Sequence, residues 1–235
     1  MNMGVVALST AQVRDPLPIV GMTVMIAAAV AAAAVSWVGW PDMADTLEEV
    51  TGPNRTPSVA TNEAVAAGIP VILLVLAVLP WLALRSAHWV TPRITGYSCG
   101  FSTSETRRDR AHGLSIVWCG LAAVMLAFHV CMVGEMVGHM MPTLEVLAVS
   151  FGVLLLTLAA AIPYFRQDPA SIPPEMRSVA EGINRGYLRA VPLLRATAGG
   201  TIVLGAVYPI VALVVGCVGM CATMIFAAAS GIREG

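Results

Sequence analysis

The stretch from Gly113 to Gly134 most constrains what this chain can fold into. It carries no formal charge over its whole length. At a rise of about 1.5 Å per residue, a helix of this length reaches about 33 Å, which is enough to cross the hydrocarbon of a bilayer. The stretch therefore predicts a transmembrane helix.

The composition of the whole chain agrees with this prediction. Hydrophobic residues make up 57% of the 235 residues, and charged residues only 11%, against about 25% in an ordinary soluble domain. A water-soluble core cannot absorb this excess, so lipid must be the solvent for much of the surface. The net charge of -1 gives no indication of nucleic-acid binding. All 13 basic residues are arginine, which together with the abundant Ala, Val and Gly suggests a bacterial protein.

Five apolar stretches are long enough to span a membrane. The expected spans are residues 17–39, 64–84, 113–134, 144–165 and 199–229. The sequence thus predicts an all-α fold: one integral membrane domain, a polytopic bundle of five transmembrane helices. The short connection between spans three and four predicts that these two form an antiparallel hairpin.

The last apolar stretch, residues 197–230, is long for one span and short for two. We favour one tilted or kinked helix whose first turns lie outside the hydrocarbon. A pair of segments that folds back is the alternative, and Pro209 lies within the stretch.

Residues 174–195, before this stretch, have apolar side chains at steps of three and four and an opposite face with Arg and Glu. This pattern predicts an amphipathic helix in the membrane interface. Packing on the cytoplasmic end of the bundle would give the same pattern.

The arginines predict the orientation. An alternation of five spans places 11 of the 13 arginines on one side, leaving only Arg55 and Arg233 opposite. The positive-inside rule makes that side cytoplasmic. We therefore expect a multi-pass protein of the cell membrane, with a cytoplasmic N-terminus and an extracytoplasmic C-terminus.

Spans three and five each have a helical face of soft side chains. Thioether, thiolate and imidazole groups are the ligands that Cu(I) prefers. If the two faces meet, they could hold copper. The candidate metal ligands are His129, Met132, Met136, His139, Cys217 and Cys221. The competing interpretation is ordinary core packing without a cofactor, because Met fills gaps and Cys behaves as a small apolar residue.

His129 lies inside span three, where an ionisable group is a candidate functional residue. A neutral imidazole that hydrogen-bonds to a neighbouring Ser, Thr or backbone carbonyl is the favoured interpretation. Glu135, near the end of the same span, would face water or partner His129.

The sequence contains no nucleophile elbow, phosphate loop or zinc-protease motif. Cys217 and Cys221 are separated by three residues, so they do not form a CxxC motif. We therefore expect that the protein is not an enzyme.

The segments around the first three spans carry a family resemblance. Gly100-Phe101-Ser102-Thr103, then Ala111-His112 before a span, resembles the motif of SdpI-type membrane proteins. The Pro41-Asp42 and Gly52-Pro53 elements are similar to the extracytoplasmic loop of the domain that often precedes that motif. The resemblance covers residues 17–135, but Ser102 replaces the family's Arg, and the motif's Trp and the usual His of the loop are missing. It implies an immunity or signalling protein that sequesters a toxin or a regulator.

These observations favour a non-enzymatic membrane protein of the binding or accessory type, with an immunity, regulatory or transporter-subunit role. Its expected partners are the lipid bilayer and either another membrane protein or a peptide toxin. The alternative is a permease or binding protein for copper or a small solute that uses the His, Met and Cys faces of spans three and five.

Overall fold

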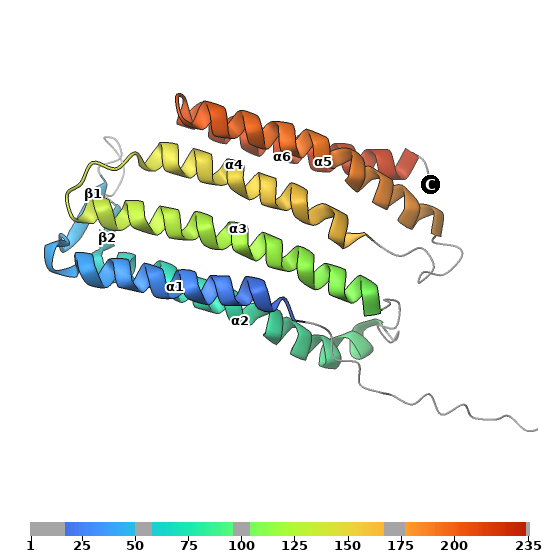
Figure 1. The fold of residues 1–235 in the computed structure, drawn as a ribbon, viewed down its shortest axis with the longest axis horizontal. Coiled ribbons are helices and arrows are strands. Elements are labelled where there is room, and N and C mark those ends of the chain that lie inside the picture. The colour runs from blue at the N-terminus through green and yellow to red at the C-terminus, as the bar shows by residue number, and fades with distance from the viewer. Residues whose placement is uncertain (1–16, 50–57, 96–103, 167–176, 234–235) are drawn as a thin grey trace, which may run out of the picture.

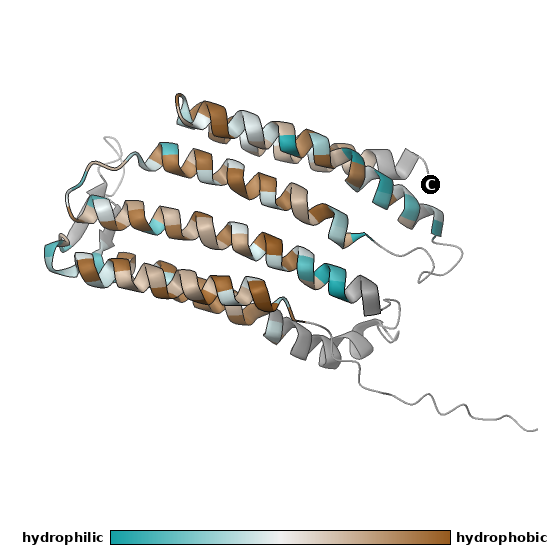
Figure 2. Cartoon of the chain, in the orientation of Figure 1, coloured by the Kyte–Doolittle hydropathy of each residue, from teal (hydrophilic) through white to brown (hydrophobic). Residues whose placement is uncertain are grey.

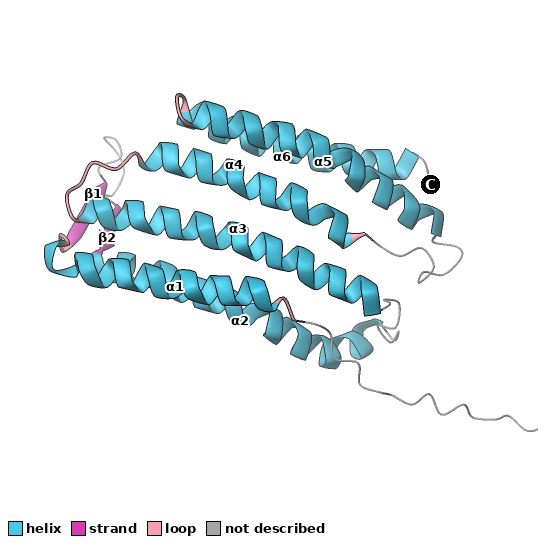
Figure 3. Cartoon of the chain, viewed as in Figure 1, coloured by secondary structure: helices cyan, strands magenta, loops and turns pink. Residues whose placement is uncertain are grey.

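The computed structural model describes residues 17–49, 58–95, 104–166 and 177–233. It is an all-α bundle with one short hairpin of strands (Figure 3). The helices are α1 (Ile19–Gly39), α2 (Asn62–Thr95), α3 (Ser104–Met136), α4 (Thr143–Ala161), α5 (Arg177–Gly205) and α6 (Pro209–Arg233), with 3-10 turns η1 (Trp40–Asp42) and η2 (Ile162–Phe165).

Five stretches of these helices are long and apolar enough to cross a membrane. They are Ile19–Asp42, Asn62–Leu79, Arg108–Met136, Thr143–Phe165 and Pro209–Ala227. The prediction of an all-α, multi-pass membrane protein is therefore confirmed. In Figure 2 apolar residues fill the middle of the bundle, and hydrophilic residues gather toward its two ends and along one half of α5.

Successive helices run in opposite directions, and α3 and α4 lie between the α1–α2 pair and the α5–α6 pair (Figure 1). The strands and the α3–α4 and α5–α6 connections lie at one end, here called the hairpin end. The start of α1 and the end of α6 lie at the other, here called the terminal end (Figure 1). Five alternating spans would place the start of the first helix and the end of the last at opposite ends of the bundle, whereas here both lie at the terminal end. The helix α5, which is not among the five apolar stretches, makes this difference.

The difference arises within the last apolar stretch. The backbone turns at residues 206–208, where the amides of Val207 and Tyr208 both donate to the carbonyl of Leu204. Pro209 then opens α6. Proline disfavours a helical residue before it but suits the first turn of a helix, so it ends one helix and begins the next.

Residues 174–195 accordingly do not form a separate helix across the end of the bundle. From Arg177 they are the first part of α5, which continues without a break to Gly205 and packs on both α4 and α6. The predicted boundary between an interfacial helix and the last span was wrong by about ten residues. Helical periodicity on both sides of residue 196 gives no signal that the two stretches are one helix.

Glycines bring the helices close together. A Cβ atom on Gly21 would lie 2.8 Å from the Ser115 Cα of α3, and one on Gly152 would lie 2.5 Å from the Ile202 side chain of α5. Gly120, Gly216 and Gly219 are crowded in the same way by residues of facing helices. Small residues at such crossings let backbones approach, which is how helices pack where lipid is as apolar as the core.

The loop between α1 and α2 contains structure that the sequence analysis did not predict. Strands β1 (Thr46–Glu49) and β2 (Ser58–Thr61) pair antiparallel, with Thr46 opposite Thr61. The Met43 side chain before the hairpin is buried beside Val65 and Met136. The Ala44 amide donates to the Met136 carbonyl at 2.9 Å. The hairpin is thereby attached to the end of α3.

Candidate functional site

Among the described residues, the His129 side chain is a fully enclosed ionisable group, 0% exposed. It lies on α3 and faces α1. Its Nε2 atom is 2.8 Å from the Ser36 hydroxyl and 2.9 Å from the Ala32 carbonyl oxygen. The Ser36 hydroxyl in turn donates to the Ala66 carbonyl of α2 at 3.1 Å. One imidazole thus connects three helices.

These contacts fix the arrangement of protons. A carbonyl oxygen only accepts, so Nε2 must carry the hydrogen that it shares between Ala32 and Ser36. The Ser36 hydrogen is then free to go to Ala66. In a neutral imidazole Nδ1 is then a bare acceptor, and no described residue hydrogen-bonds to it. The expected contacts of this imidazole, with a neighbouring Ser or Thr or a backbone carbonyl, are present as Ser36 and the Ala32 carbonyl.

A second polar group lies at the hairpin end, where α3 meets α4. The Thr143 hydroxyl, at the first residue of α4, donates to the Glu135 carboxylate. Glu135 therefore partners Thr143 and not His129. Because this bond crosses the short α3–α4 connection, it holds the two helix ends together.

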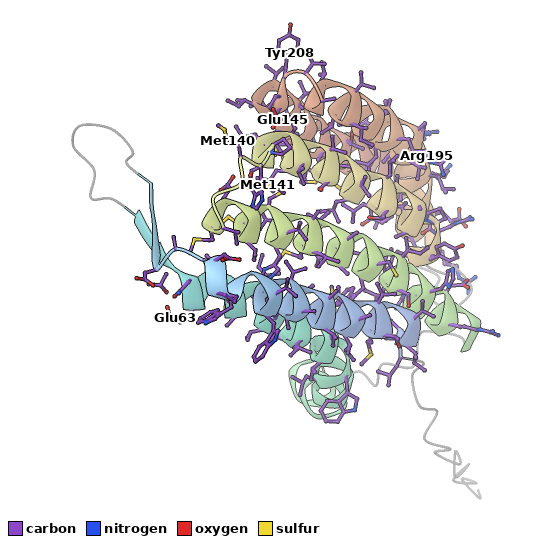
Figure 4. The ribbon with its side chains drawn as sticks, turned by 60° about the vertical axis from the view of Figure 1, so that its left-hand side comes forward. Glu63, Met140, Met141, Glu145, Arg195 and Tyr208 are labelled. Atoms are coloured by element: carbon purple, nitrogen blue, oxygen red, sulfur yellow. The ribbon has the colours of Figure 1, made fainter. Side chains whose placement is uncertain are left out.

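The same connection has one turn that needs glycine. Gly138 has φ +84°, a left-handed conformation that side chains rarely adopt. The chain then returns so that Met141 covers Gly134, whose Cβ would lie 2.8 Å from the Met141 Cγ. Met140 points away from the protein, and Figure 4 shows both methionines beside Glu145 at this end.

The six predicted metal ligands do not come together. His129 and Met136 of α3 are buried toward α1 and α2, and Met132 packs against the cluster that contains Met136. His139, in the connection after α3, is exposed. On α6, Cys217 and Cys221 are exposed, and this helix packs on α4 and α5. Within the described ranges no three His, Cys, Asp or Glu side chains converge as a metal site would require. Met136 of α3 is buried in a core cluster, and Met132 packs against that cluster.

Sequence reasoning missed the partners of these groups. Ser36 and Thr143 are single hydroxyl residues in apolar stretches, and each becomes informative only when the facing helix is known. The sequence did show a polar serine within an alanine-rich span, but it does not show which neighbouring helix that serine faces.

The segment with the family resemblance is only partly described. Gly100-Phe101-Ser102-Thr103 lies outside the described residues. Ala111 is buried in α3. The His112 ring packs edge-on against Tyr164 of η2, with ring centroids 4.8 Å apart. His112 thus helps to join α3 to the end of α4 at the terminal end.

Comparison of the chain with known protein families, with curated proteins and with solved structures found no match in any of the three.

Proposed function

We propose that this chain is a non-enzymatic integral membrane protein of the binding or accessory type, acting in an immunity, regulatory or transporter-subunit role. The observation that carries the proposal is the closely packed helix crossings, in which glycines of α1, α3, α4 and α6 meet side chains or backbone of the next helix at contact distance. A bundle packed in this way suits a scaffold that presents its ends and outer faces to a partner.

The orientation follows from charge. Every arginine in the described part of the chain lies at or toward the terminal end, on α2, α3, α5, α6 or just after η2. The positive-inside rule favours a cytoplasmic location for that end. Because α1 starts and α6 ends there, we infer that the start of α1 and the end of α6 both face the cytoplasm of a bacterial cell. The hairpin end then faces outward.

The outward end is acidic. Asp42, Asp45 and Glu63 are exposed around the hairpin, and Glu135 and Glu145 are half-buried beside it. The hairpin itself is attached to α3 through Met43 and Ala44. A cationic peptide or a basic extracytoplasmic segment of another membrane protein is the complementary partner. The resemblance to SdpI-type proteins points to the same class of partner, a toxin or a regulator.

Native mass spectrometry of the tagged full chain, extracted from its host in mild detergent, tests this proposal. We expect a complex whose mass exceeds whole copies of this chain by the mass of a peptide or protein partner. D42N/D45N should weaken that complex, whereas the matched double variant D109N/E181Q at the terminal end should not. These four carboxylates are all exposed, so each pair changes the charge equally.

A complex that survives D42N/D45N unchanged would locate the partner elsewhere and contradict the role of the acidic end. A mass of the protein plus copper, without a partner, would favour the permease or metal-binding alternative.

A further inference from the structure

The first half of α5 has an exposed face that combines arginine with apolar side chains. Arg177, Arg185, Arg189 and Arg195 are all exposed, and so are Tyr187, Leu188 and Leu193 between them. The opposite face is buried and consists of small or apolar residues that pack on α4 and α6. These are Ala180, Gly182, Gly186, Ala190, Val191 and Leu194, with Asn184 as the polar exception. The helix is thus amphipathic, but its apolar side is occupied by the bundle.

Arg195 lies inside the apolar layer along the helix axis. Gly205 of α5 lies against Ala148, five residues after α4 begins. Arg195 precedes Gly205 by ten residues, so it lies roughly 22 Å from the start of α4, while the span Thr143–Phe165 covers roughly 35 Å. Arg195 is therefore roughly 12 Å short of the terminal end of that span.

The packing of α6 gives the same depth independently. Gly219 lies against Thr197 of α5, and the apolar span of α6 ends eight residues later, at Ala227. Arg195 is then roughly 9 Å inside that end. Figure 4 shows Arg195 on the outside of the bundle, on the side of the view opposite to Tyr208, Met140 and Glu145.

A guanidinium exposed at this depth needs an anion. No hydrogen bond or ion pair joins Arg195 to another described residue. A charged side chain within the hydrocarbon costs several kcal/mol unless it reaches the head groups or a partner. Its aliphatic stem can lie along Leu193 while the charged group extends toward the interface. Arg189, six residues earlier, lies about 9 Å nearer to the terminal end, at the level where α4 finishes.

We propose that this face of α5 binds an anionic phospholipid, with the phosphate held by Arg195 and the acyl chains against Leu188 and Leu193, while the positive charge of Arg189 attracts the head group. An arginine can bind phosphate oxygens in a bidentate manner. Basic side chains at the level of the head groups attract anionic lipid by about 1 kcal/mol each. The exposed leucines provide the apolar contact that a soluble phosphate would not use, so the surface fits a lipid. This inference is independent of the partner proposed for the hairpin end.

Native mass spectrometry of the full chain in lipid-free mild detergent, titrated with phosphatidylglycerol or phosphatidylcholine, tests it. We expect wild type to bind phosphatidylglycerol more tightly than phosphatidylcholine. R189Q/R195Q should weaken phosphatidylglycerol binding by roughly 25-fold, from about 1 kcal/mol per arginine. The matched control R108Q/R110Q removes two exposed arginines of α3 at the same end and should stay within about twofold of wild type.

Arg195→Lys keeps the charge and the long stem, so it preserves folding, but it should still lose several-fold because an ammonium group cannot bind phosphate in a bidentate manner. Equal binding of the two lipids, or equal losses in the two double variants, would overturn the proposal. Wild-type affinity in Arg195→Lys would overturn the bidentate contact. A dimer that depends on Arg195 and holds no lipid would also overturn the proposal, because the occupant of this face would then be a second copy of this chain.

Discussion

The crossing of α3 and α4 at Gly120 offers the sharpest test of the packing. These two helices join the α1–α2–α3 half of the bundle to the α4–α5–α6 half. A Cβ atom on Gly120 would lie 2.2 Å from the Thr157 Oγ1, 2.7 Å from its Cγ2 and 2.8 Å from its Cβ. Distances below 3.0 Å are not seen for real Cβ atoms. Gly120→Ala must therefore move the helices apart or force Thr157 out of its rotamer.

The expected cost follows from this overlap. Inserting a methyl group into a well-packed site costs typically about 1–3 kcal/mol. The same change at Gly199 of α5 meets nothing within 4 Å, so Gly199→Ala should be neutral or gain up to about 1 kcal/mol from the lower backbone entropy of alanine. The two alanine variants should thus differ by about 1–4 kcal/mol in free energy of unfolding, with Gly120→Ala the less stable.

The measurement is equilibrium unfolding by SDS in mixed micelles, followed by circular dichroism. Thr157→Ala in the Gly120→Ala background removes the two nearest atoms and leaves the Cβ at 2.8 Å, so it should recover about half of the loss. Equal stability of Gly120→Ala and Gly199→Ala would refute the close α3–α4 crossing. A loss that Thr157→Ala does not reduce would show that another contact is responsible.

Three further predictions use the buried and exposed groups. His129→Leu removes hydrogen bonds worth about 0.6 kcal/mol each in membranes, but it also removes a buried Nδ1 atom without a described partner, which is itself destabilising. Because these two effects oppose each other, we expect the free energy of unfolding to change by no more than about 1 kcal/mol. A loss above about 2 kcal/mol in the SDS assay would contradict this expectation. Cys217 and Cys221 are exposed on a span and so face lipid, where the thiolate that attacks a maleimide is disfavoured, and Cys131 is 2% exposed. All three should therefore react with a maleimide only after unfolding in SDS; mass spectrometry of single-cysteine variants reads this, and rapid labelling of native Cys131 would be inconsistent with the fold. Reporter fusions at the N- and C-termini, with green fluorescent protein and alkaline phosphatase, should both indicate the cytoplasm; opposite sides would restore the five-span topology.

Much of the fold could be predicted from the sequence, because hydrocarbon thickness sets the length of a span. The stretches around Gly113–Gly134 and residues 144–165 have lengths and compositions that only a transmembrane helix satisfies, and α3, α4 and η2 cover them. The end of α5 was harder. The Tyr208-Pro209 pair breaks a stretch that reads as one apolar helix, and whether proline kinks a helix or starts a new one depends on what the preceding turn packs against.

For the candidate site, the sequence predicted the type of partner that His129 needs but not which residues provide it. The chemistry of His129 required a hydroxyl or carbonyl partner, and Ser36 and Ala32 provide both. The metal hypothesis needed one further condition, that the soft faces of α3 and α6 meet, and the sequence does not say which surfaces of two spans face each other. A stripe of Met or Cys has the same period whether it faces another helix or lipid, so periodicity could not distinguish Met136, which is buried, from Cys217, which is exposed.

The sequence by itself determined that this chain is a multi-pass membrane protein and that its long apolar stretches are helical, since both follow from hydrophobicity and length. Only the tertiary structure decided which side of each helix faces the bundle, where α5 turns into α6, and how deep Arg195 lies. The physical reason is that lipid is as apolar as the protein core, so hydrophobicity does not rank the faces of a span. The inward face of a span is instead marked by glycine contacts, such as Gly205 with Ala148 and Gly219 with Thr197.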